Sequence, residues 1–123
     1  MQLKFKMENY LKNPIEENGN HFTGFLDIYI ETLYSKRTDF ARDMDITPVN
    51  LSQIINKHRE PKEEFILKLM IHSEMAFKDV GSFNKEIWYL IYYHEKIDNI
   101  MSRQDQWRPE IEKQVKFTEL VEK

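Results

Sequence analysis

Five apolar residues between positions 37 and 61 are spaced as a helix-turn-helix requires, and this spacing constrains the fold more than any other feature. They converge only if two short helices, at about 37–44 and 48–55, cross over a tight turn. Thr47 and Pro48 predict a sharp start for the second helix, because a hydroxyl caps a helix and a proline at its first position loses no bond. The five residues are Phe40, Met44, Ile46, Leu51 and Ile54, with the small Ala41 at the crossing.

The composition favours an all-α chain. Of the 123 residues 41% are hydrophobic, which is ample for one core, and only three are glycine and four proline. No strand-like alternation bounded by turn residues is present. The chain has no cysteine, which excludes disulfides, cysteine-based zinc sites and thiol catalysis, and suits a cytoplasmic protein. Neither a leader nor an apolar run long enough to cross a membrane is expected.

We predict three parts along the chain. Residues 1–22 form an N-terminal arm outside the core, because the run NPIEENGN is polar and contains both proline and glycine. Residues 23–78 form the helix-turn-helix domain. Within it, residues 24–34 form a helix that packs under the motif through Phe25, Ile28, Tyr29 and Leu33, and residues 62–77 form a second, which turns Phe65 and Leu69 inward.

Residues 79–123 form a C-terminal helical segment for dimerisation or partner binding. From 82 to 108 its apolar residues recur every four and three positions, as in the seam of a coiled coil. We expect Pro109 to end this helix and a last amphipathic stretch to follow at 110–121. The predicted seam consists of Phe83, Ile87, Leu90, His94, Ile97 and Met101.

The distribution of charge bears on possible partners. The net charge of the chain is −3, but residues 36–62 carry six Lys or Arg against four acids, a local +2. A small basic region on an acidic body is compatible with modest binding of a nucleic acid.

Residues 24–75 resemble the lambda-repressor-like (Xre-type) helix-turn-helix regulators, which implies a helix-turn-helix bundle that binds double-stranded DNA as a homodimeric repressor. The family pattern is L-A, an apolar residue, G-V-S, an apolar residue, S-x-I and N-G-K-R-x-P. Asp45 and Lys57 stand where the pattern has glycine, so both should adopt a left-handed or turn backbone. The matching residues are Phe40-Ala41, Met44, Asp45-Ile46-Thr47, Leu51-Ser52-Gln53-Ile54 and 56–61 (NKHREP).

If the motif binds DNA, the helix at 48–55 enters the major groove and its N-terminal residues face the bases. Asn50 and Gln53 suit adenine, and Pro48 and Val49 suit a thymine methyl, which implies an A/T-rich site. The predicted base-reading residues are Thr47, Pro48, Val49, Asn50 and Gln53. By similarity to the family, the phosphate contacts are Arg37, Asn56, Lys57, His58 and Arg59.

Two other interpretations stay open. The architecture resembles antitoxins that grip a partner toxin through extra helices and repress their own operon. Alternatively, the chain is an interaction module without DNA binding, since four acids beside the proposed DNA face would repel phosphate. An enzyme has little support: the four histidines lack metal-ligand spacing, and neither a cofactor nor a metal site is expected. The acids are Asp39, Asp43, Asp45 and Glu60, and the histidines His21, His58, His72 and His94.

Overall fold

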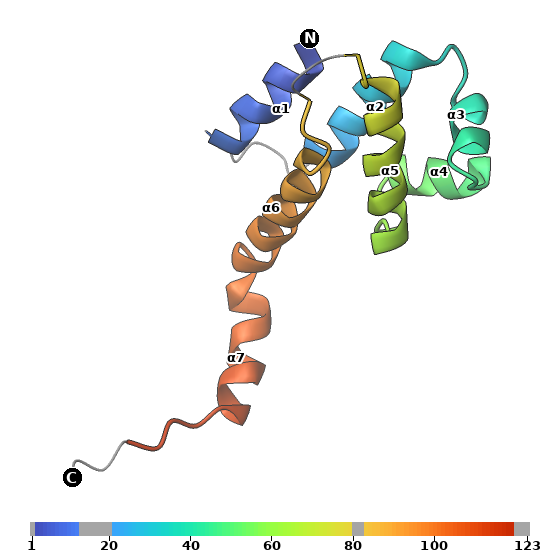
Figure 1. The fold of residues 1–123 in the computed structure, drawn as a ribbon. Helices are drawn as coiled ribbons and strands as arrows, with labels where there is room; N and C mark the ends of the chain where they lie inside the picture. Colours follow the sequence, from blue (N-terminus) through green and yellow to red (C-terminus); the bar gives the residue numbers. More distant parts are fainter. Residues whose placement is uncertain (1, 13–20, 80–82, 120–123) are drawn as a thin grey trace.

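A computed structural model describes residues 2–12, 21–79 and 83–119, and all regular structure within these residues is helical (Figure 1). The predicted all-α class is therefore confirmed. Most helices gather in one body, from which the end of α6 and all of α7 project as an arm (Figure 1). The elements are α1 (Gln2–Lys12), α2 (His21–Leu33), α3 (Arg37–Asp43), α4 (Pro48–Ile55), α5 (Glu63–Ala76), α6 (Ile87–Met101) and α7 (Gln104–Gln114).

The two predicted helices of the motif are present as α3 and α4, and they contact each other. Four of the five residues expected to converge are buried, and Ile46 packs against the same core. Ala41 is fully buried between the helices. The apolar spacing therefore predicted this helical pair correctly. The buried four are Phe40, Met44, Leu51 and Ile54.

Helix α2 lies at the centre of the body, in contact with α1, α3, α4 and α6. Its fully buried residues recur at intervals of four, three and one, so they form one stripe along the helix. Tyr29 is buried as predicted and Phe25 and Ile28 are partly buried, but Leu33 is exposed, so that expectation was wrong. Its place is taken by Phe22, Leu26 and Ile30, which are buried.

Helix α1 contradicts the expectation that residues 1–22 lie outside the core. Leu3, Met7 and Tyr10 are buried and pack against α2 and α6. The Tyr10 hydroxyl lies 3.0 Å from Nδ1 of His94 on α6. Residues 2–12 are thus part of the domain, and α2 already begins at residue 21. The polar run at 13–20 lies outside the described residues.

A series of hydrogen bonds connects α2, α3 and α5 around the half-buried ring of His72. The Tyr34 hydroxyl donates to Asp43 Oδ2 (2.7 Å), so it must accept from His72 Nε2 (2.7 Å). The other ring nitrogen, Nδ1, then accepts from the Tyr29 hydroxyl (2.6 Å). This pattern requires a neutral imidazole that carries its proton on Nε2. These hydrogen bonds hold α3 at a fixed position relative to α5.

The C-terminal segment differs from the prediction in where its helix breaks. Helix α6 begins at Ile87, after the Asn84 side chain accepts the Glu86 N–H, and it ends at Met101. Pro109 does not end a helix but lies inside α7. Because α7 buries none of its residues, the carbonyl group left free by the proline faces water, and the interruption is tolerated.

We predict that Met7→Ala destabilises the protein by about 2–4 kcal/mol, since this side chain is fully buried and its removal leaves a cavity. Urea unfolding followed by the fluorescence of buried Trp88 measures the change. Phe5→Ala is the matched control: Phe5 is on the same helix but 62% exposed, so its loss should change stability by less than about 0.5 kcal/mol. Equal stabilities for Met7→Ala and the parent would contradict the packing of α1.

A second prediction concerns the stability of the protein as the pH is lowered. Burial lowers the pKa of His72, and nearby Asp43 opposes this in part. The unfolded chain therefore binds a proton at a higher pH than the folded one, so stability falls as pH drops below the unfolded pKa of about 6.5. Thermal unfolding between pH 8 and 5 should show a steeper loss in the parent than in His72→Gln. Because His72→Gln keeps every carboxylate, including Asp39 and Asp43, it controls for the effect of their protonation on stability. Parallel plots of stability against pH for the parent and this variant would refute the prediction.

Candidate nucleic-acid interface

The turn between α3 and α4 is built as the motif requires. Asp45 has a left-handed backbone (φ 55°), as predicted for this position. Its carbonyl accepts a hydrogen bond from Lys68 Nζ on α5 (3.2 Å), which fixes the turn to the body. Thr47 then caps α4, because its hydroxyl accepts the Asn50 N–H (3.1 Å), and Pro48 occupies the first helical position. The start of α4 is thereby well defined.

The end of α4 is closed by a Schellman motif. The His58 N–H donates to the Gln53 carbonyl (2.9 Å) and the Lys57 N–H to the Ile54 carbonyl (3.2 Å). Lys57 has φ 63°, so its predicted left-handed backbone is also confirmed. A left-handed conformation disfavours a lysine by about 1–2 kcal/mol, so surrounding contacts must hold this turn.

Helix α4 presents an uncharged polar face to the outside. Val49 is 66% exposed, Ser52 and Asn56 are exposed, and Gln53 is partly exposed. The Asn56 amide donates to the Ser52 hydroxyl (3.2 Å), which joins the last two turns of this face. We name these four residues the outer face of α4. Ser52 was missed from the sequence, although its spacing from Val49 and Asn56 places it on one side of a helix.

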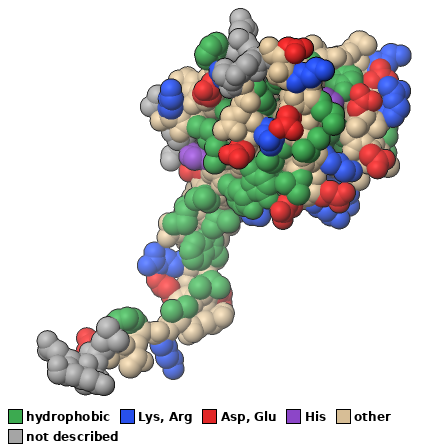
Figure 2. Space-filling view, viewed as in Figure 1, with side chains coloured by type: hydrophobic (Ala, Val, Ile, Leu, Met, Phe, Trp, Pro, Cys, Tyr) green, Lys and Arg blue, Asp and Glu red, His purple; other side chains and the backbone are tan. Residues whose placement is uncertain are grey.

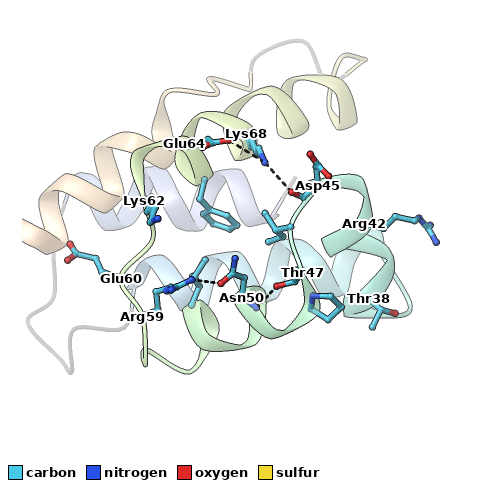
Figure 3. A pocket seen from close by; sticks show the side chains of 14 residues that line it. Thr38, Arg42, Asp45, Thr47, Asn50, Arg59, Glu60, Lys62, Glu64 and Lys68 are labelled. Atoms are coloured by element: carbon cyan, nitrogen blue, oxygen red, sulfur yellow. Dashed lines mark hydrogen bonds and ion pairs between the residues drawn. The ribbon is translucent and has the colours of Figure 1, made fainter.

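The predicted base-reading residues do not all share this face. Val49 and Gln53 belong to it, and Pro48 and Thr47 are exposed at the N-terminus of α4, with the Thr47 hydroxyl engaged in the cap. Asn50 instead points to the side, where its Oδ1 accepts a hydrogen bond from Arg59 (Figure 3). Asn50 and Arg59 thus line an open groove of about 670 Å³ between α4 and α5, whose wall also holds Lys62 and Lys68.

The predicted phosphate contacts lie at the start of α3 and directly after α4, and most already have partners. Arg37 pairs with Asp27 on α2 (2.7 Å) and is half exposed. Lys57 lies 3.8 Å from Glu95 on α6. Asn56 belongs to the outer face, and His58 is exposed. The structure therefore places four of these residues directly after α4 and Arg37 at the start of α3, and it adds an acidic partner, Glu95, that the sequence did not indicate.

Glu95 ties α6 to the motif. Its side chain is only 13% exposed, and its Oε2 accepts the Phe22 N–H at the start of α2 (3.1 Å). Burial raises the pKa of this carboxyl, while the Phe22 N–H and Lys57 oppose that shift. Because Glu95 caps α2 and also pairs with Lys57, it fixes the turn after α4 relative to α6.

A second link between α6 and this turn runs through Glu60. Its Oε1 accepts the Tyr92 hydroxyl (3.0 Å) and pairs with Lys96 Nζ (3.4 Å). The Tyr92 hydroxyl also lies 3.4 Å from the Pro61 carbonyl. The segment 57–61, between α4 and α5, is thus held by α6 along its length.

The predicted seam on α6 is divided between two environments. Ile87 is buried and Phe83 is partly buried, whereas Leu90, Ile97 and Met101 are exposed. His94 is half-buried against Tyr10. The prediction that these six residues form one interface is therefore wrong for the residues that face the body. The face of α6 that enters the core is centred instead on Ile87, Trp88 and Ile91.

No group of three or more His, Cys, Asp or Glu residues that could hold a metal is found within residues 2–12, 21–79 and 83–119. In the same part of the chain, no helix is long and apolar enough to cross a membrane. Neither models of protein families, nor curated proteins, nor solved structures gave a match to this chain.

We predict that Glu95→Ala lowers the free energy of unfolding by about 2–3 kcal/mol, because it removes a helix cap and leaves a buried N–H without an acceptor. Glu95→Gln keeps an acceptor for the Phe22 N–H and loses only the charge that faces Lys57, so its loss should be smaller. Urea titrations of both variants measure the difference. If the two variants unfold at the same urea concentration as the parent, Glu95 does not hold α2 and the turn together.

Proposed function

We propose that this protein is a sequence-specific DNA-binding transcription regulator of the repressor type, which inserts α4 into the major groove. The observation that carries the proposal is the outer face of α4. This face is uncharged and mostly polar, Lys57, His58 and Arg59 follow α4 directly, and Arg37 lies at the start of α3. A helix that reads bases needs such a face, whereas the cations beside it hold the backbone.

The chemistry of the outer face supports an A/T-rich site. The Gln53 amide presents a donor and an acceptor together, as the N6 and N7 edge of adenine requires. Val49 is a branched apolar side chain that fits a thymine methyl. Ser52 and Asn56 add hydroxyl and amide groups on the same side of the helix. Asn50 could contact a base only after its hydrogen bond with Arg59 is broken, so it is the second candidate after Gln53.

The acids near the motif are less of an obstacle than their number suggests. Asp39 pairs with Arg42 (3.3 Å), and Asp43 accepts the Tyr34 hydroxyl. Asp27 neutralises Arg37 only through an exposed ion pair, and such pairs stabilise by about 1 kcal/mol or less. Exchange of Asp27 for a DNA phosphate therefore costs little, and it releases counterions from the DNA.

A second candidate function is protein binding without DNA binding, as in an interaction module or an antitoxin that grips its toxin. The observation that favours it is the set of exposed apolar side chains on α6 and α7. The two functions differ in their use of α4, because only DNA binding requires the outer face. Neither function involves catalysis or a cofactor, and both suit a protein of the cytoplasm.

We expect Gln53→Ala to weaken binding to the cognate site by about 1–3 kcal/mol while non-specific binding stays unchanged, since one bidentate base contact is lost. Arg59→Ala should weaken binding to cognate and scrambled DNA alike, with a shallower salt dependence. Fluorescence anisotropy at two salt concentrations, with DNA from upstream of its own gene, measures both effects.

Gln106→Ala serves as the matched control, because this glutamine is exposed on α7, away from the motif. It should bind as the parent does. The proposal fails if the parent protein does not bind this DNA at low salt. It also fails in its choice of helix if Gln53→Ala and Asn50→Ala both bind cognate and scrambled DNA as the parent does.

A further inference from the structure

A stripe of exposed apolar side chains runs along α6 and α7 and shares only Leu90 and Ile97 with the predicted seam. Its members follow each other at intervals of 3, 4, 3, 7 and 4 residues, the spacing of a heptad repeat in which Gln104 occupies the one polar position. All of them are partly or largely exposed. We name this set the outer stripe: Leu90, Tyr93, Ile97, Ile100, Trp107 and Ile111.

The outer stripe is continuous across the junction of the two helices. The Trp107 indole N–H donates to the Ile100 carbonyl (2.8 Å), and the Ser102 N–H donates to the Asp98 carbonyl (2.9 Å). The two helices therefore form one arm, with a bend at residues 102–103 between them, as Figure 1 shows. Figure 2 shows hydrophobic side chains along this arm, on the part that projects from the body.

The area of this surface is large enough for a stable interface. Together with Met101 and Val115, the outer stripe comprises eight side chains with exposed fractions from 37% to 67%. Because a large side chain carries roughly 150–250 Å², these eight present on the order of 800 Å². If a partner covered all of it, that area would be comparable to the roughly 800 Å² that each partner contributes to an interface of standard size.

The charges of the arm favour a second copy of the same chain over a strongly charged partner. Residues 87–117 contain five Lys or Arg and five Asp or Glu, so two arms can approach without net repulsion. In an antiparallel pair in which Ile97 of one copy faces Trp107 of the other, Lys96 lies level with Arg108 of the other copy and about 3 Å along the axis from Glu110, within reach of that carboxylate. Lys96 and Glu110 now make surface ion pairs within the chain, with Glu60 and Lys113, and these are weak enough to exchange.

Helix α7 adds an independent argument that the arm is covered. It has eleven residues, buries none of them and contains Pro109. Isolated helices shorter than about 12–15 residues are marginal in water, and an internal proline weakens them further. Contact with a partner along Trp107 and Ile111 would supply the missing stabilisation.

We infer that the outer stripe is the surface through which two copies of this chain associate, with α6 and α7 of one copy antiparallel to those of the other. The partner is thus a second copy. This inference deepens the proposed function, which needs two copies of α4 on one DNA, but its test does not involve DNA. The two ideas can therefore fail separately.

The first test is the mass of the full chain in solution. Interfaces of this area bind with micromolar or lower dissociation constants, so the parent should be a dimer at about 50 µM by light scattering. Ile97→Glu places a charge at the centre of the outer stripe and should raise the dissociation constant by about 30-fold or more. Met75→Glu, at an exposed apolar residue on α5, is the matched control and should remain dimeric.

Circular dichroism of each variant separates loss of association from loss of folding. A monomeric parent at this concentration overturns the inference, and so does a dimer that Ile97→Glu leaves intact. If the parent is a monomer that forms a defined complex with another protein, and Ile97→Glu abolishes that complex, the surface binds a different partner and the second copy is excluded.

The orientation is tested by disulfide cross-linking, which is unambiguous here because the chain has no cysteine. In the antiparallel pair, Met101→Cys lies next to its own copy and should form a covalent dimer under mild oxidation. Gln114→Cys then lies about 36 Å from its copy, given a rise of about 1.5 Å per residue, and should not cross-link. Cross-linking of both variants would show a parallel pair and overturn the proposed orientation.

Discussion

The buried carboxylate of Glu95 is the contact on which the rest of the structure depends. It joins three elements that are distant in sequence: α6, which carries it, the start of α2, which it caps, and the turn after α4, which it holds through Lys57. An ionised group in such a position is favourable only if hydrogen bonds and an opposite charge replace the water that it loses. Because Glu95 has both, the body and the motif take one fixed relative position.

Around this contact, the fold separates two surfaces that lie at different places. The outer face of α4 is polar and uncharged, and α3, α5 and the segment 57–61 fix its direction. The outer stripe is apolar and lies on the arm, beyond the body. Helix α6 is connected to both surfaces. One side of it holds the segment after α4 through Glu60 and Glu95, and another side carries Leu90 and Ile97 of the outer stripe. A rigid helix between two surfaces keeps the separation between them constant.

Much of the motif could be predicted from the sequence, because its interactions are local. The apolar spacing indicated α3 and α4, and the comparison with a glycine-containing pattern indicated the left-handed backbone at Asp45 and Lys57. The packing of α1 could not be predicted, because its partners on α6 lie more than eighty residues away. The core face of α6 was misjudged since it contains Glu95, a charge that interrupts the apolar pattern. The direction of Asn50 depends on a hydrogen bond with Arg59, which no spacing rule indicates.

Helix α7, which buries none of its residues, has a thermodynamic consequence for the proposed association of the arm. If its eleven residues are ordered mainly by contact with a partner, association and helix formation are one coupled event, and part of the contact energy is consumed in ordering the backbone. The affinity is then lower than the area of the outer stripe would suggest, and it responds strongly to temperature. A weak, reversible pair of this kind lets the concentration of the protein itself determine how many molecules are paired at any time.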